Sequence, residues 1–125
     1  MIVIKKILVV DDDKNICELL NLYLKKEGYE VVFAYDGSEA VNMAKTENPN
    51  LILLDVMMPV MNGYEATEKI RSSNHPLATT IPIIAQTANA FQDDIKKVKE
   101  VGMNAHISKP IEEENLLKIL AEFKK

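Results

Sequence analysis

Short apolar segments alternate regularly with longer amphipathic segments along this chain, and this alternation limits the fold more than any other feature. Continuous apolar runs of this length are typical of strands that are covered on both faces, as in a parallel sheet. The segments that we expect to form strands are KILVV (6–10), YEVVFA (29–34), LILL (51–54), IPIIA (81–85) and AHIS (105–108).

A helical pattern follows each expected strand, because apolar residues recur there with helical spacing. The marking positions are Ile16, Leu20, Tyr23 and Leu24 with Gly28 as a C-terminal cap; Ala40, Val41 and Ala44 with Ser38 as N-cap and Pro49 beyond the end; Tyr64–Arg71; Phe91, Ile95 and Val98 closed by Gly102; and Leu116, Leu120 and Phe123. A strand–helix pair repeated five times predicts a single (βα)5 doubly wound α/β domain with a five-stranded parallel sheet and helices on both faces.

Size and composition agree with one domain over residues 1–125, because 47% of the 125 residues are hydrophobic and can form a core. The net charge of −4 argues against non-specific nucleic-acid binding, which requires a basic face. Cys17 is the only cysteine, so it has no partner for an internal disulfide. No apolar run approaches the roughly 18 residues that a membrane span requires. We therefore expect a cytoplasmic protein without membrane contact.

Polar residues follow four of the expected strands. In an open parallel sheet, binding sites form beyond the carboxyl ends of the strands. The residues placed there are Asp11, Asp12 and Asp13 after the first strand, Asp55 after the third, Gln86 and Thr87 after the fourth, and Lys109 and Pro110 after the fifth. We expect the fold to bring these acids, the hydroxyl and the lysine to one edge of the sheet.

Three of these acids, Asp11, Asp12 and Asp55, would repel one another, and at least one pKa should rise unless a cation lies among them. Mg²⁺ suits such oxygen ligands, whereas Zn²⁺ does not, since neither His75 nor His106 belongs to the cluster. A carboxylate beside Mg²⁺ can attack phosphorus and become an aspartyl phosphate.

Two further residues, Lys109 and Thr87, would then bind the phosphoryl oxygens, one as a fixed positive charge and the other as a hydroxyl donor. Taken singly, each feature has an ordinary explanation: acids at a helix N-terminus, a surface lysine and a strand-end threonine. Their joint placement is what favours a phosphoryl site.

Four motifs together, ILVVDDD, LILLDVMMPVMNG, IPIIAQTANA and HISKPI, resemble the receiver domain of two-component response regulators, a flavodoxin-like fold. The resemblance covers essentially the whole chain. It implies that Asp55 is the phosphoacceptor and that Asp11, Asp12, a side-chain oxygen of Asp55 and the backbone carbonyl of Met57 hold Mg²⁺. It also implies a catalytic and switching role for Thr87, a catalytic role for Lys109, and a cis Lys109–Pro110 bond.

The partners implied by the resemblance are a histidine kinase or a histidine phosphotransfer protein, which would supply the phosphoryl group from a phosphohistidine. The segment from Gln86 to Ile111 is more similar to receivers of hybrid sensor histidine kinases than to those joined to DNA-binding domains. Whether the chain stands alone or belongs to a longer protein is left open, as is a weak homodimer through the fourth and fifth helices.

Phosphorylation of such a domain changes the surface of its fourth helix, fifth strand and fifth helix. The family usually has Tyr or Phe at the switching position of the fifth strand, and this chain has His106. An imidazole there would weaken the aromatic rotation or replace it with a hydrogen bond, and would add pH dependence near neutrality. Met57 and Asn89 lie where the access of water to the phosphate would be adjusted.

Other functions remain as alternatives. The Asp-x-Asp in VVDDDK also resembles haloacid-dehalogenase-like phosphatases, in which the first acid, here Asp11, is the nucleophile, but the remaining motifs of that family do not follow. A receiver-like binding module that is never phosphorylated is a second alternative, although no expected acid or lysine is missing. A flavin binder is disfavoured, because the acidic loop after the first strand would repel the FMN phosphate.

Overall fold

The computed structural model describes residues 3–88 and 92–123, with the backbone alone for residues 92–94. It contains one sheet of five parallel strands: β1 (Lys6–Val10), β2 (Glu30–Ala34), β3 (Leu51–Asp55), β4 (Ile83–Thr87) and β5 (Ala105–Ser108). The strand order is β2-β1-β3-β4-β5, so the chain reverses its direction of travel across the sheet between β2 and β3. The predicted flavodoxin-like fold is confirmed.

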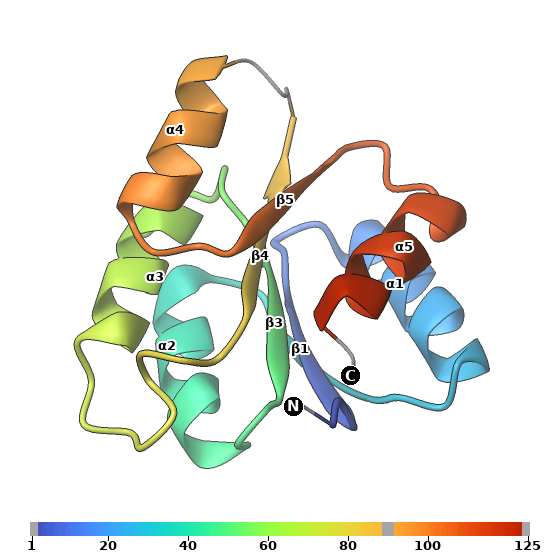
Figure 1. Cartoon of the computed structure of the whole chain (residues 1–125), viewed down its shortest axis with the longest axis horizontal. Coiled ribbons are helices and arrows are strands. Elements are labelled where there is room, and N and C mark those ends of the chain that lie inside the picture. The colour runs from blue at the N-terminus through green and yellow to red at the C-terminus, as the bar shows by residue number, and fades with distance from the viewer. Residues whose placement is uncertain (1–2, 89–91, 124–125) are drawn as a thin grey trace.

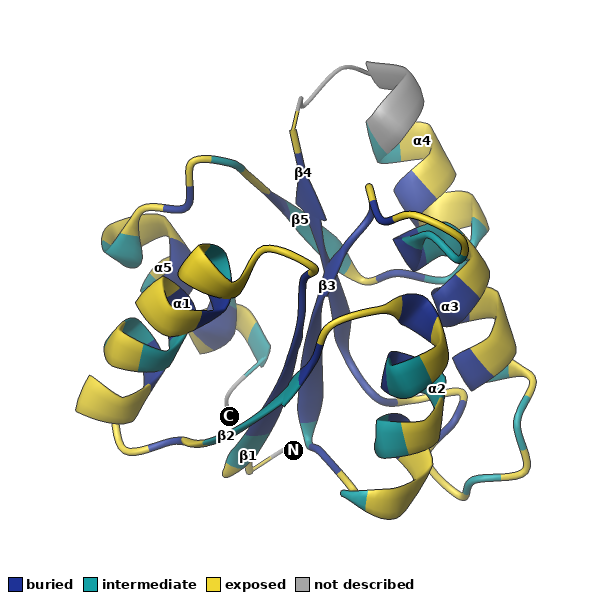
Figure 2. Ribbon diagram, turned by 180° about the vertical axis from the view of Figure 1, so that it is seen from behind, coloured by how far each residue is buried: buried dark blue, intermediate teal, exposed yellow. Residues whose placement is uncertain are grey.

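Five helices cover the two faces of the sheet: α1 (Lys14–Lys26), α2 (Gly37–Thr46), α3 (Gly63–Arg71), α4 (Gln92–Glu100) and α5 (Glu113–Phe123). α1 and α5 lie on one face, and α2, α3 and α4 lie on the other (Figure 1). Each face has its own apolar core, because side chains of a strand alternate between the faces. Val9, Leu53, Ile84 and Ile107 belong to the α1/α5 core, and Leu8, Leu54 and Ala85 belong to the core under α2, α3 and α4. The central strands β1, β3 and β4 are therefore buried on both faces, the edge strands β2 and β5 are partly exposed, and the helices expose their outer sides (Figure 2).

The strand boundaries differ from the sequence prediction at three places. β3 includes Asp55, because this residue pairs in register with Gln86 of β4. β4 begins at Ile83 and continues to Thr87, since Pro82 has no N–H group to donate. β2 begins at Glu30, one residue later than expected.

The helix ends agree with the prediction at the glycines but not at one N-cap. Gly28, with φ +89°, follows the C-cap of α1, and Gly102, with φ +98°, follows the end of α4. The predicted N-cap at Ser38 is wrong. Asp36 caps α2, because its extended backbone lets its Oδ1 accept the Glu39 N–H at 2.7 Å, and Ser38 lies inside the helix. The expected helix marker Phe91 lies outside the described residues.

Within the described ranges 3–88 and 92–123, no helix combines the length and the apolar character that crossing a membrane would require.

Candidate functional site

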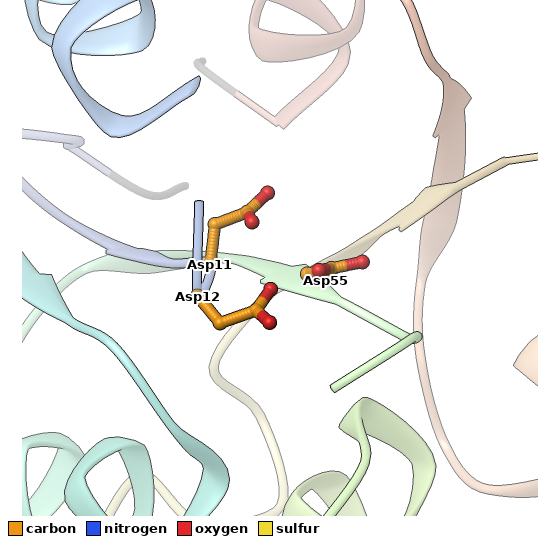
Figure 3. A group of neighbouring side chains, drawn as sticks. All are labelled: Asp11, Asp12 and Asp55. Carbon is orange, nitrogen blue, oxygen red and sulfur yellow. The ribbon is translucent and has the colours of Figure 1, made fainter. Parts of the chain in front are cut away.

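Three carboxylates meet at the carboxyl edge of the sheet, where β1 and β3 run side by side. Asp11 and Asp12 follow β1, and Asp55 ends β3. One oxygen from each lies within 4.8 Å of the others (Figure 3). Asp11 is fully buried and Asp55 is 2% exposed, whereas Asp12 is exposed. The group therefore has a buried inner part and an opening to solvent at Asp12.

Local backbone donors hold the two buried carboxylates in place. The N–H of Asp13 donates to Asp11 Oδ1 at 2.9 Å, and the N–H of Met57 donates to Asp55 Oδ1 at 3.1 Å. The side chain of Asp13 accepts the Asn15 N–H and caps α1, so the third acid of the DDD run stabilises the helix instead of joining the carboxylate group.

A single lysine connects the two buried acids. Lys109 follows β5, and its Nζ lies 3.0 Å from Asp11 Oδ2 and 3.3 Å from Asp55 Oδ1. Its backbone N–H donates to the Thr87 carbonyl at 2.8 Å, which ties the end of β5 to the end of β4. The Lys109–Pro110 peptide bond is cis, as the resemblance implied. The predicted meeting of acids from β1 and β3 with the lysine after β5 is present in the structure.

The electrostatics of the site follow from its burial. Burial, followed by the charge of Asp11, raises the pKa of Asp55 to about 6, although the Met57 N–H and Lys109 act in the opposite direction. Burial would lower the pKa of Lys109, but the carboxylates of Asp11 and Asp55 more than compensate and raise it. The site therefore keeps a charged lysine beside a carboxyl group that holds its proton more tightly than usual.

The donor set fits a hard divalent cation. All three neighbouring groups offer carboxylate oxygens, which Mg²⁺ prefers, and the opening at Asp12 leaves room for water ligands. Cys17 is not a member of this group: its Sγ donates to the Asp11 carbonyl, and burial, followed by the charges of Asp11 and Asp13, raises the pKa of the thiol to about 11. Of the four Mg²⁺ ligands implied by the resemblance, the structure brings together the three carboxylates. It places Met57 two residues beyond Asp55, with an exposed side chain.

The two residues expected to act in switching lie on β4 and β5. Thr87 ends β4, and its buried Oγ1 has no hydrogen-bond partner among the described residues. His106 lies half-buried on the edge strand β5 and lines a hollow of about 240 Å³ together with Lys118 and Ile119 of α5. Asn89, expected to influence water access, lies outside the described residues.

One polar residue of the site had been given no role from the sequence. Gln86 is fully buried in β4, and its Nε2 donates to the carbonyl of Val10, the residue before Asp11, at 3.4 Å. The signal that could have found it is a carboxamide that directly follows the apolar residues IIA in the buried strand IIAQT, where burial is costly without partners.

Comparisons with known proteins agree with this geometry. The family model of the response regulator receiver domain matches residues 7–121. The structure is similar to the chemotaxis protein CheY4 of Vibrio cholerae, with 34% sequence identity, coverage of 95% of this chain and 98% of that chain, and a TM-score of 0.89.

Two receiver domains of histidine kinases are also similar. For one from a sensor histidine kinase of Pseudomonas aeruginosa, the identity is 36%, the coverage is 94% of this chain and 95% of that chain, and the TM-score is 0.85; that structure has a magnesium ion coordinated in its active-site cleft. For one from a signal transduction histidine kinase of Syntrophus aciditrophicus, the identity is 30%, the coverage is 94% of this chain and 88% of that chain, and the TM-score is 0.83. From the family match, the fold and the acidic pocket, we conclude that this chain belongs to the receiver domains of two-component response regulators.

Proposed function

We propose that residues 1–125 act as one receiver domain that accepts a phosphoryl group on Asp55 from a phosphohistidine of a partner protein. The observation that carries this proposal is the contact of a buried Asp55 carboxylate with the Lys109 ammonium, 3.3 Å away, beside the acids of the β1 loop. A buried acid with a fixed cation at its side is suited to bind a group that brings negative charge.

The two oxygens of Asp55 have different surroundings, which supports a division of roles in which one oxygen is held by the protein and the other remains available. Oδ1 accepts the Met57 N–H and contacts Lys109, whereas Oδ2 has no partner among the described residues. A carboxylate oxygen of Asp55 attacks phosphorus, the P–N bond of the phosphohistidine breaks, and the imidazole leaves with the electron pair and takes up a proton. Lys109 then binds an oxygen of the phosphoryl group that has formed the new P–O bond.

Asp11, Asp12, Asp55 and the backbone carbonyl of Met57 would hold Mg²⁺, which when bound neutralises charge on the transferring oxygens. Asp11 is held by the Asp13 N–H and by Lys109, so its orientation is set before any ion binds. Thr87 would donate its hydroxyl to the phosphoryl group, because its buried Oγ1 has no protein partner among the described residues. His106 on β5 would change its packing in response, which alters the surface of α4, β5 and α5.

A groove beside the site supports docking of a phosphohistidine-bearing partner. The groove has a volume of about 410 Å³, and it is lined by Ile16, Leu19 and Leu20 of α1 and by Ala88, Lys109, Pro110 and Ile111. Its walls are almost entirely apolar, and Leu19 is 38% exposed. Since a phosphohistidine must reach Asp55, its protein must cover the loops around the site, and this groove is an apolar surface next to them.

The alternative that Asp11 is the nucleophile of a phosphatase is less consistent with the geometry. Asp11 is fully buried, and each of its oxygens already has a contact, one with the Asp13 N–H and one with Lys109. Asp55 retains an oxygen without a partner. A receiver-like module that is never phosphorylated is also disfavoured, because the residues that phosphorylation requires are together. One oxygen of each of the three acids lies within 4.8 Å of the others, and Lys109 contacts Asp11 and Asp55.

The test is intact mass spectrometry after incubation with acetyl phosphate, with Mg²⁺ and with EDTA. We expect one phosphoryl adduct that requires Mg²⁺ and disappears in Asp55→Asn. Asp13→Asn is the matched control, because asparagine also caps helices and Asp13 lies outside the carboxylate group. An adduct that persists in Asp55→Asn and disappears in Asp11→Asn would favour the phosphatase alternative, and an adduct that forms equally in EDTA would contradict the role of the metal.

A further inference from the structure

Gln86 is a buried polar group whose hydrogen bonds are incomplete. Its side chain is fully buried, and its Nε2 donates to the Val10 carbonyl at the long distance of 3.4 Å. Its Oε1 is also buried and has no hydrogen-bond partner in the described part of the chain. Burying a carboxamide in this way costs stability, so an apolar side chain would serve packing better.

The alternation of side chains places Gln86 on the same face of the sheet as the phosphoacceptor site. Val9, Leu53, Ile84 and Ile107 all belong to the core under α1 and α5. Residues two positions apart in a strand lie on the same face. Asp11, Asp55, Gln86 and Lys109 each follow one of these core residues by two positions.

The register places Gln86 beside Asp55, and its carboxamide reaches toward the level one residue below that acid. Gln86 pairs with Asp55, and Val10 pairs with Leu54, one residue before Asp55. β3 lies between β4 and β1. To reach the Val10 carbonyl, the Gln86 side chain must therefore cross β3 on the face that carries Asp55. The carboxamide thus forms a polar layer between Asp55 and the apolar core.

We propose that Gln86 is a positioning residue of the phosphoacceptor site. Its Nε2 holds the Val10 carbonyl and so orients Asp11, and its Oε1 is an acceptor on the face from which Lys109 reaches Asp55. The Lys109 ammonium has three N–H donors, and in this structure it contacts two carboxylate oxygens. Gln86 Oε1 would offer the Lys109 ammonium a further acceptor when that ammonium turns from Asp11 toward the phosphoryl group. This inference rests on the proposed function.

The variant Gln86→Met tests the proposal, because methionine has a similar length and shape but no hydrogen-bonding groups. The matched control is Ile84→Met, on the same strand and the same face but one pleat farther from the site. For both variants and the wild type, three quantities are measured: the urea midpoint of unfolding, the Mg²⁺ affinity of the unphosphorylated chain by NMR titration, and the phosphorylation rate with acetyl phosphate. Gln86→Leu repeats the test with a second apolar side chain.

We expect Gln86→Met to unfold at an equal or higher urea concentration than the wild type. We also expect it to bind Mg²⁺ several-fold more weakly, because the hydrogen bond to the Val10 carbonyl that orients Asp11 is lost. Phosphorylation should be about tenfold slower, because Lys109 loses the proposed acceptor Oε1. Ile84→Met should unfold at a lower urea concentration and keep its phosphorylation rate within about twofold, because its side chain serves packing only. The proposal therefore predicts opposite patterns for the two variants.

Unchanged Mg²⁺ affinity and unchanged phosphorylation rate in both Gln86 variants would overturn the proposal. Parallel losses of stability and rate would also overturn it, because they would indicate a packing role. If the wild type itself is not phosphorylated, or if Asp55→Asn still is, the proposed function fails instead. In that case the Mg²⁺ titration still decides whether Gln86 orients Asp11.

Discussion

Asp55 is a residue whose burial destabilises its charged form. The fold buries this carboxyl group beside Asp11, and burial together with the neighbouring charge raises its pKa to about 6, from an ordinary value of 3.8. The folded chain therefore binds a proton between these two values that the unfolded chain has already released. As the pH rises from about 4 to about 6, the free energy of unfolding should fall. Above about pH 6 the whole destabilisation from the ionised Asp55 carboxylate is present.

We predict that Asp55→Asn is more stable than the wild type above pH 6 in the absence of divalent ions. The difference between a pKa of about 6 and the ordinary 3.8 corresponds to roughly 2–3 kcal/mol. The gain should shrink as the pH falls from about 6 to about 4, and it should vanish well below the ordinary pKa of 3.8, where the wild-type carboxyl group is neutral in both states. Urea unfolding in EDTA at several pH values measures it.

The control for this prediction is Asp36→Asn. Asp36 caps α2 outside the site, and asparagine accepts the same hydrogen bond from Glu39, so the change in stability should be small at every pH. A loss of stability in Asp55→Asn at pH 7 would show that the Lys109 contact outweighs burial and the repulsion from Asp11.

At the scale of the elements, Arg71 at the end of α3 joins three segments. Its guanidinium donates to the carbonyls of Gly102, Ala78 and Ile81 and to Asn104 Oδ1, at distances between 2.7 and 3.1 Å. Asn104 Oδ1 also accepts the N–H of Ile83, at the start of β4. Arg71 therefore links α3, the loop before β4 and the turn between α4 and β5.

We predict that Arg71→Lys lowers the free energy of unfolding by about 2 kcal/mol, because lysine keeps the charge but lacks the planar fork that reaches several carbonyls. Urea unfolding measures the loss. Lys69→Gln, an exposed change in the same helical turn, should cost less than about 0.5 kcal/mol. Equal stability of Arg71→Lys and the wild type would mean that a single ammonium can satisfy these carbonyls.

At the scale of the whole molecule, the apolar groove and the acidic site share one end of the sheet. The groove between α1 and the segment after β5 includes Lys109, which also contacts Asp55. A partner seated in this groove would lie next to Asp55, the proposed phosphoacceptor, whereas a small phosphodonor would need only the acidic opening. Protein and small-molecule donors can therefore be separated by changes in the groove.

We predict that Leu19→Gln slows transfer from a phosphohistidine-bearing protein by about tenfold, because an apolar contact of the proposed docking groove is lost. Its reaction with acetyl phosphate should stay within about twofold of the wild type, because Leu19 supplies none of the oxygens or charges of the acidic group. Radiolabel transfer and intact mass spectrometry measure the two reactions.

The matched control is Leu77→Gln. Leu77 is also exposed, but it lies near Asn50 and Pro82, at the opposite edge of the sheet where β3 and β4 begin. It should leave both reactions unchanged. Equal slowing with both donors in Leu19→Gln would indicate a disturbed site and would argue against docking in the groove.

The sequence by itself determined the elements and the inventory of the site. Strands such as LILLD and helix ends such as Gly28 could be predicted because apolar periodicity and left-handed caps are local properties of the chain. The strand–helix order placed Asp11, Asp55 and Lys109 at one sheet edge, since parallel strands end on the same side. The N-cap at Ser38 was wrong because two nearby polar residues could cap α2, and the backbone conformation of Asp36 selected it.

Only the tertiary structure decided which member of the DDD run is buried, which is exposed and which caps α1, because those roles depend on how α1 packs over β1. It also decided that Lys109 bridges Asp11 and Asp55, and that Gln86 reaches across β3 to Val10. These contacts join residues that are far apart in the sequence, and they depend on the strand order β1-β3-β4-β5 and its register. Local patterns carry no information on strand order, so the contact of Gln86 with Val10 across β3, beside Asp55, became visible only in the folded chain.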